Sequence, residues 1–397
     1  MNRLAIHDVL LVSDDVVAEI LSHLPVRSLL RFKTVNKSWH DIIDSWAFTK
    51  LHLENYCNNC SNNNGILVRV YDGNTKKWKL STKFLDCSKL CGELTLDNDF
   101  LELFSKTEQS FIPRMVGAID GLICIYGVRP STPIALCNPS LAETQTLPMS
   151  PISSTGVDLR NVGFGFDFVH KDLKVVQLLT CFSTKPYRLH VEVYSQSTNT
   201  WREILDHQIP NYMSIKKAIM PYKNGSFCFS HWLAFQRFQP FDDANFFILS
   251  FNMQNEVFER TPLPPCVHDA ADAGQLKLKF FAKDDSLLLF VYPLWERFSL
   301  EDECFGRWLL NGLGDKGRWT RLSSVGPLLG VPKPLALWKS HELVFKRWGE
   351  EKKLILYNSS TQEIRNTVKI SKKQYGLTVL GYKGSLISPV IFMKAQL

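Results

Sequence analysis

A single unit recurs along most of the chain and restricts the folds that the chain can adopt. Each copy is a short alternating strand, a few turn-forming residues and an outgoing strand that opens on a large side chain in most copies. The two residues that flank the turn are seven positions apart in five copies and nine apart in the other. These pairs are Tyr71 and Trp78, Cys137 and Thr144, Tyr194 and Trp201, Phe251 and Phe258, Leu310 and Trp319, and Tyr357 and Ile364. A constant spacing of this kind predicts a series of β-hairpins with similar turns.

The spacing between copies predicts how the hairpins assemble. The second members of the pairs lie 66, 57, 57, 61 and 45 residues apart, and a strand-like segment such as "DGLICIYG" or "DDSLLLFVY" precedes most copies. A four-stranded antiparallel sheet cannot bury both of its faces alone, whereas sheets stacked around an axis can. We therefore predict an all-β, kelch-like propeller of about six blades, with a β-sandwich or two stacked barrels as alternatives.

The first part of the chain has helical periodicity instead. An apolar stripe falls on one helical face at Val16, Val17, Ile20, Leu21 and Leu24, and two further helical segments follow Pro25. Three short helices approach the lower size limit of an independent core, so this part needs another surface to cover it. The predicted domains are helical residues 8–53, an Asn-rich linker at 54–66 and the all-β region at 67–397, in an α+β multidomain chain.

Composition narrows the environment and the partners. Apolar residues make up 45% and charged residues 21% of the chain, the balance of a soluble globular protein. The net charge of +7 is not clustered, which argues against nucleic acid as a partner. No apolar run approaches the length of a membrane helix, and the start of the chain does not resemble a signal peptide. We expect a cytoplasmic protein, with the nucleus as an alternative, whose thiols are reduced.

The motifs of common active sites and cofactor sites are absent. Two close cysteine pairs are present, Cys57 with Cys60 and Cys87 with Cys91, but the first lies in an Asn-rich loop, the second is spaced CxxxC and no zinc-finger framework surrounds them, so we expect incidental thiols. The "GFGF" at 163–166 lacks the third glycine of a dinucleotide fingerprint. Neither a phosphate-binding loop nor a nucleophile elbow is present. The sequence predicts no catalytic residue, no metal and no cofactor.

Both regions resemble known families. Residues 14–53, with their "EILSHLP", "SLLRFK" and "KSWHDII" segments, resemble the F-box of a large group of plant proteins, although Val12 and Ser13 replace the usual Leu-Pro. "GAIDGLICI", "LCNPSLAETQTLP" and "VGFGFDFVHKDLKVV" resemble landmarks of the F-box-associated, kelch-like domain of that group. Within it the chain is most similar to S-locus F-box-like proteins, some of which act in pollen self-incompatibility.

The resemblance implies a non-catalytic subunit of an SCF-type ubiquitin ligase. Its F-box would bind an SKP-type adaptor, and through it a cullin and a RING protein, while the C-terminal domain would capture a protein substrate for degradation. An apolar helical face laid in a partner groove is a common binding mode. We expect about half of the adaptor-contact residues to pack internally as well. The implied contacts are Ile20, Leu21, Leu24, Pro25, Leu29, Leu30, Phe32, Val35 and Trp39.

Three long connections are candidates for substrate contact, namely 150–160, 231–246 and 294–308. They mix aromatic, arginine and acidic residues, which are typical of interface hot spots. Two other functions stay open at this point. The chain could be a free-standing kelch-like binding module capped by its helices, or a kelch-type enzyme similar to a sugar oxidase.

Overall fold

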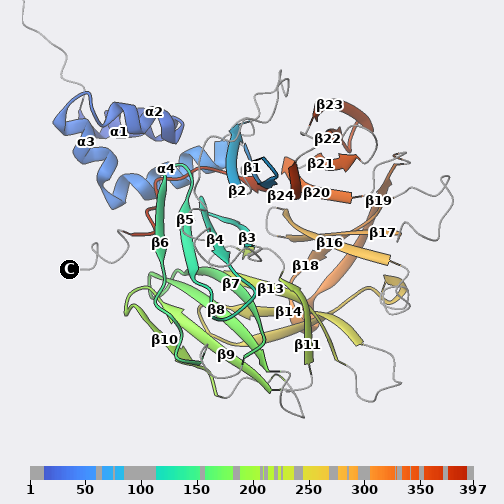
Figure 1. The fold of residues 1–397 in the computed structure, drawn as a ribbon. Coiled ribbons are helices and arrows are strands. Elements are labelled where there is room, and N and C mark those ends of the chain that lie inside the picture. Colours follow the sequence, from blue (N-terminus) through green and yellow to red (C-terminus); the bar gives the residue numbers. More distant parts are fainter. Residues whose placement is uncertain are drawn as a thin grey trace, which may run out of the picture.

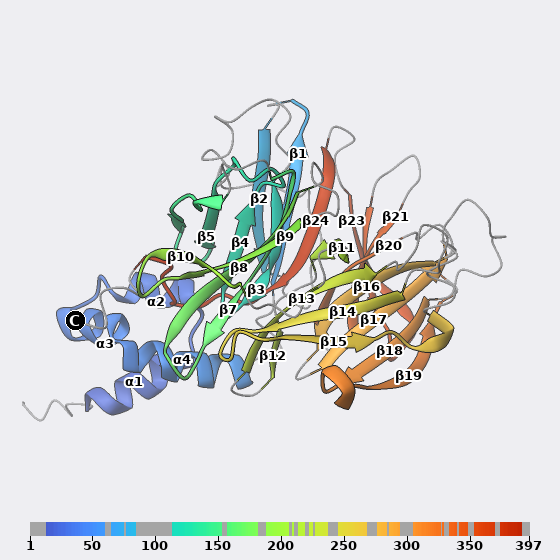
Figure 2. The same cartoon turned by 90° about the horizontal axis from the view of Figure 1, so that it is seen from below.

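A computed structural model describes residues 13–390, with gaps of which the longest are 85–112, 182–187, 237–244, 268–275 and 294–304. Helices occupy the first part and strands the remainder, as the sequence indicates (Figure 1). Viewed from below, the helices lie at one edge of a ring of sheets (Figure 2).

The N-terminal part contains four helices where three were expected. They are α1 (Asp14–Ser22), α2 (Val26–Phe32), α3 (Lys37–Asp44) and α4 (Trp46–Asn59). Ser45 separates the last two, because its backbone is extended and its Oγ accepts a hydrogen bond from the N–H of Phe48 at 3.1 Å. The predicted bounds of the Asn-rich loop, 54–66, are therefore wrong on both sides. Helix α4 continues to Asn59, and strand β1 already begins at Gly65. Packing of α4 on α1 explains the extension, because the amide of Asn55 donates to Ser22 Oγ at 2.8 Å.

The β region forms six antiparallel sheets among the described residues. The first contains β24 (Gln374–Tyr382), β1 (Gly65–Asp72) and β2 (Lys77–Phe84). The second contains β3 (Arg114–Ile119), β4 (Leu122–Tyr126), β5 (Ile134–Asn138) and β6 (Glu143–Thr146). The third contains β7 (Leu159–Asp167), β8 (Asp172–Cys181), β9 (Arg188–Ser195) and β10 (Thr200–Glu203).

The other three sheets follow the same plan. The fourth contains β11 (Met213–Ala218), β12 (Tyr222–Asn224), β13 (Phe227–Gln236), β14 (Asn245–Asn252) and β15 (Phe258–Pro262). The fifth contains β16 (Leu276–Lys283), β17 (Ser286–Pro293), β18 (Phe305–Asn311) and β19 (Arg318–Val325). The sixth contains β20 (Lys333–Lys339), β21 (Glu342–Arg347), β22 (Lys353–Asn358) and β23 (Glu363–Lys369).

The sheets are arranged as the blades of a propeller. The inner strands contact one another in the order β16, β20, β24, β3, β7 and β11. The C-terminal strand β24 pairs with the N-terminal strand β1, so the two ends of the β region meet within one blade. The predicted fold class is confirmed: N-terminal helices precede an all-β propeller, and the six sheets agree with the expected blade number.

All six predicted residue pairs face each other across hairpins. Four turns share one geometry, with a left-handed residue at Ala142, Asn199, Glu256 and Gln362, each five positions after the first member of its pair. The hairpin of Tyr71 and Trp78 differs from the other five in its place within the blade. Their hairpin joins the second and third strands of its blade, because β24 occupies the innermost place, and it therefore lies at the opposite end of the sheets from the others.

Two of the paired tryptophans also link neighbouring blades. Trp201 Nε1 donates to the carbonyl of Pro148 at 2.7 Å, and Trp319 Nε1 donates to the carbonyl of Pro262 at 2.8 Å. In each case the proline lies at or just beyond the outer strand of the preceding blade. The repeated large side chain is thus both a hairpin residue and a contact between blades.

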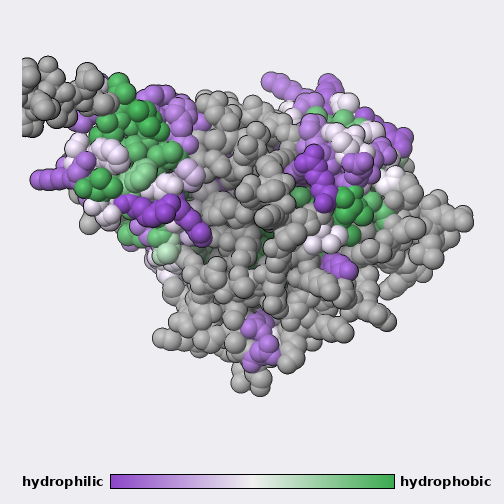
Figure 3. Space-filling model, turned by 90° about the horizontal axis from the view of Figure 1, so that it is seen from above, coloured by the Kyte–Doolittle hydropathy of each residue, from purple (hydrophilic) through white to green (hydrophobic). Residues whose placement is uncertain are grey.

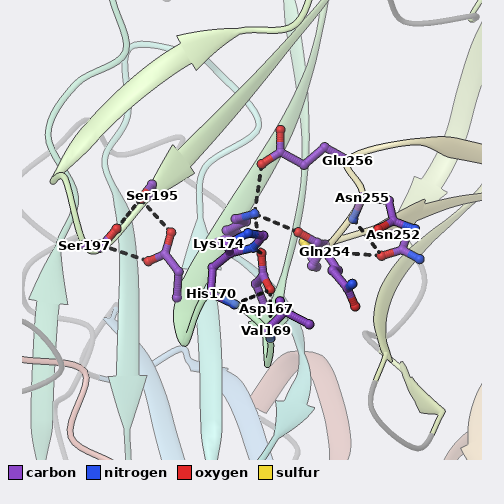
Figure 4. Close-up of polar contacts among 12 residues, drawn as sticks. Asp167, Val169, His170, Lys174, Ser195, Ser197, Asn252, Gln254, Asn255 and Glu256 are labelled. Atoms are coloured by element: carbon purple, nitrogen blue, oxygen red, sulfur yellow. Dashed lines mark hydrogen bonds and ion pairs between the residues drawn. The ribbon is translucent and has the colours of Figure 1, made fainter. Parts of the chain in front are cut away.

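A buried ion network joins the third and fourth blades (Figure 4). Lys174 Nζ lies 2.6 Å from Asp167 Oδ2 and 2.9 Å from both the Met253 carbonyl and Glu256 Oε1. His170 Nδ1 lies 2.8 Å from the same Asp167 oxygen, whose side chain is fully buried. Burial alone would raise the pKa of Asp167, but hydrogen bonds from the His170 backbone and from Lys174 outweigh it and hold the pKa below its usual range.

The tryptophan contacts can be tested with Trp201→Phe. The substitution keeps an aromatic six-membered ring and removes the pyrrole ring with its N–H donor, so we expect the free energy of unfolding to fall by at least about 1 kcal/mol. Denaturant titration measures the change. Trp319→Phe should cost a similar amount, and the double variant should show the sum, because the sites lie in different blades. A double variant no less stable than either single variant would contradict this.

The ion network predicts an acid-sensitive contribution to stability. Because the pKa of Asp167 is lowered in the folded state, its stabilisation is complete above the unfolded-state pKa and is lost as the pH falls through the folded-state value. Asp167→Asn should lower stability at neutral pH by about 1.5–3 kcal/mol and flatten the acid limb of the stability curve. Urea titrations between about pH 3 and pH 7 test this, and an unchanged acid limb would contradict it.

Candidate partner-binding surfaces

The N-terminal helices share a small core of their own. Its fully buried residues are Leu21, Val26, Leu29, Ile43 and Phe48. Two of the predicted adaptor contacts, Leu21 and Leu29, are therefore inside, with 2% and 0% of their surface exposed. They support the helical surface from beneath in this conformation.

Other apolar side chains of the helices face outward. Val16, Ile20 and Val35 are 49%, 59% and 59% exposed, and Pro25 is also exposed. Figure 3 shows a hydrophobic patch over this part of the molecule. We call Val16, Ile20, Pro25 and Val35 the helical apolar surface. Exposed apolar residues that form a patch typically mark an interaction site, which makes these residues candidates for contact with a partner.

The remaining predicted contacts, Leu24, Leu30, Phe32 and Trp39, are half-buried around the core. Phe32 and Trp39 meet edge to face, with ring centroids 5.5 Å apart. The backbone at Leu24 is fixed by His52, whose Nε2 lies 2.9 Å from the Leu24 carbonyl. Burial lowers the pKa of His52, which favours its neutral form. The contact roles of all nine residues stay predictions.

Two features of the helical region could not be predicted from the sequence: the exposure of one apolar residue, and the propeller residues that pack against the helices. Val16 belongs to the predicted stripe, but its exposure shows only in the structure. Leu141, in a turn of the second blade, and Leu386, beyond β24, pack against the helices from the other side. Their contact could not be read from local pattern, because these residues lie far from the helices in the sequence.

The candidate substrate connections lie at the other end of the propeller. Each inner strand starts at that end and runs toward the end where the helices dock, as strand order and pairing require. Much of 231–246 and the last residues of 294–308 are strand, in β13, β14 and β18. Their loop portions, 237–244 and 294–304, lie outside the described residues.

The third candidate, 150–160, is anchored at both ends by buried polar side chains. Ser150 Oγ donates to Glu192, whose pKa is raised by burial. Arg160 is 3% exposed and donates to the carbonyls of Gly127 at 2.9 Å and Thr132 at 2.7 Å. Burial lowers the pKa of Arg160 to about 10. Arg160 therefore shapes the neighbouring β4–β5 connection from inside and is not available to a substrate.

The polar network of the third and fourth blades resembles an acid–base site only superficially. Lys174 is held by three oxygen acceptors, and His170 contacts Asp167. Among the residues that the structure describes, no hydroxyl or thiol is recorded in contact with His170. The contacts of Lys174 tie the third and fourth blades together.

Within the described residues, no group of three His, Cys, Asp or Glu could hold a metal ion. The side chains of Cys57, Cys60, Cys87 and Cys91 lie outside the described part of the chain. No helix in the described ranges is long and apolar enough to span a membrane.

Comparison with known proteins accounts for both regions. The F-box domain family matches residues 10–51, and the F-box associated beta propeller domain family matches residues 94–388. An F-box/kelch-repeat protein of Arabidopsis thaliana is 25% identical over 83% of this chain and 83% of its own length. Two other F-box proteins of that plant are 24% identical over 83% of this chain and 77% of the relative, and 27% identical over 63% and 74%. This architecture is that of F-box substrate-recognition proteins, and the chain belongs to the family of F-box proteins with an F-box associated beta propeller domain.

Proposed function

We propose that this protein is the substrate receptor of an SCF-type ubiquitin ligase. The helical apolar surface binds an SKP-type adaptor, which links it to a cullin and a RING protein, and the propeller captures a protein substrate. The observation that carries the proposal is that Val16, Ile20 and Val35 stay exposed although the helices are docked on the propeller. The chain covers one side of its helical core and leaves the other for a second polypeptide.

The two ends of the propeller carry different surfaces, which supports this role. The helices dock at the hairpin-turn end of the second blade, near Leu141, while the strand ends that flank the three candidate substrate connections lie at the opposite end of the sheets. A substrate held by those connections would not compete with the adaptor for space. The protein would act as a non-catalytic scaffold that supplies proximity, in the cytoplasm or the nucleus.

A narrower form of the proposal concerns the pathway. Similarity to S-locus F-box-like proteins points to pollen self-incompatibility, and it rests on that resemblance alone. The alternative of a free-standing binding module is favoured if the helical apolar surface engages no adaptor.

Adaptor binding is tested with Ile20→Asp combined with Val35→Asp. Both side chains are 59% exposed, so the fold should tolerate the change, while a charge in a desolvated interface weakens binding by at least about 30-fold. Calorimetric titration with a purified SKP-type adaptor measures the affinity. Leu205→Asp, at an apolar residue of the propeller that is 84% exposed, is the matched control and should bind normally. Equal affinity for all three proteins would refute the assignment.

Substrate capture is tested with the same variants in cells in which the proteasome is inhibited. A true substrate should be retained by the wild-type protein and by the Ile20/Val35 variant, because the propeller is unchanged. It should be ubiquitinated only with the wild-type protein. Ubiquitination that persists with an adaptor-binding-deficient variant would show that the modification does not depend on this receptor.

A further inference from the structure

The segment that follows β24, residues 383–390, lies between the helices and the propeller; we call it the C-terminal clasp. In Figure 1 it is the red chain that passes beside α4. Leu386 is 9% exposed and packs in the core of the helices, whereas the next residue, Ile387, is 7% exposed and packs in the core of the second to fourth blades. Two adjacent side chains thus belong to two different cores.

Hydrogen bonds from the propeller fix the backbone of the clasp. Asn138 Nδ2 donates to the carbonyls of Ser385 at 3.0 Å and Ile387 at 2.7 Å, and its buried side chain comes from the end of β5. Ser385 Oγ donates to the Asp120 carbonyl at 2.6 Å. Gly121 has a left-handed φ of 78°, and a Cβ there would lie 2.3 Å from Ser385 Oγ, so the turn admits the clasp only with glycine.

Gly384 of the clasp lies close to a propeller turn and within van der Waals range of the helices. A Cβ on Gly384 would lie 2.5 Å from Ser140 Oγ and 3.7 Å from a methyl group of Val26, at the start of α2. Leu141, next to Ser140, contacts the same helical core. The docking surface is therefore a composite of the clasp and one propeller turn.

The helical core has few members, so each one matters. The helices supply five fully buried apolar side chains, and Leu386 from the clasp is the sixth. A domain of this size is near the limit below which a core needs outside support. The helices precede the propeller in the chain, and the clasp directly follows β24, the strand that pairs with β1.

We propose that the C-terminal clasp completes the F-box core, so that binding of the adaptor is coupled to closure of the propeller. A chain whose propeller has not closed lacks the sixth core side chain and does not hold the helical apolar surface in its binding geometry. The part of this inference that concerns the adaptor rests on the proposed function, and the part that concerns the core does not.

The test uses the full-length protein with Leu386→Ala. Hydrogen exchange of amides in α1 to α3 should accelerate by at least about ten-fold, because a buried leucine is lost from a small core. Amides of the propeller strands should exchange as in the wild type, and affinity for a purified SKP-type adaptor should fall by a similar factor. Val390→Ala, at a residue of the same segment that is 48% exposed, is the control and should change neither measurement.

A second variant acts from the propeller side without touching the helices. Asn138→Asp retains the acceptor oxygen and replaces the amide donor by an oxygen that faces two carbonyls, so it should loosen the clasp. We expect faster exchange in the helices and weaker adaptor binding from this distant change.

The outcomes separate the two claims. Unchanged helix exchange in both variants would overturn completion of the core by the clasp. Faster exchange with unchanged adaptor affinity would overturn the coupling. If the wild-type protein does not bind the adaptor at all, the proposed function fails, whereas the exchange measurements still decide whether the clasp completes the core.

Discussion

Pairing of the last strand with the first is the interaction on which the remaining structure depends. β24 aligns with β1 over Gly65 to Asp72, and it is also the inner strand that bridges the blades before and after it. Without it, the ring of sheets would have two free edges, and open edges of sheets are prone to pair with other chains. The same strand leads directly into the clasp that packs against the helices, so the contact that closes the propeller and the contact that docks the helices are neighbours in the chain.

Repetition allows irregular sheets to build a regular ring. Four hairpins place a left-handed residue at the same turn position, and side chains at the next blade boundary, such as Trp201 and Trp319, donate to a carbonyl of the preceding blade. Between the third and fourth blades, the buried charge of Lys174 is matched by three oxygen acceptors. The architecture thus tolerates different blade lengths because neighbouring blades meet through equivalent positions.

Local pattern predicted the hairpins well, since each is decided within about a dozen residues. All six pairs, including Leu310 with Trp319, were readable because turn residues and large side chains recur at fixed spacing. The continuation of α4 through an Asn-rich segment was not readable, because it depends on Asn55 meeting α1. The burial of Leu21 and the exposure of Ile20, neighbours on the same stripe, were likewise decided by packing between helices. Contacts of the clasp join residues that are far apart in the sequence, so no local sequence pattern could predict them.

The concentration of fixed contacts at one end of the propeller has an evolutionary consequence. Helix docking, the clasp and most of the repeated hairpin turns all occupy the same end, and ring closure requires only the strands. Insertions and replacements in the connections at the far end would leave that framework intact, apart from anchors such as Arg160. Relatives with the same framework could therefore diverge in the surface at the far end after gene duplication while keeping the same docking of helices on the propeller.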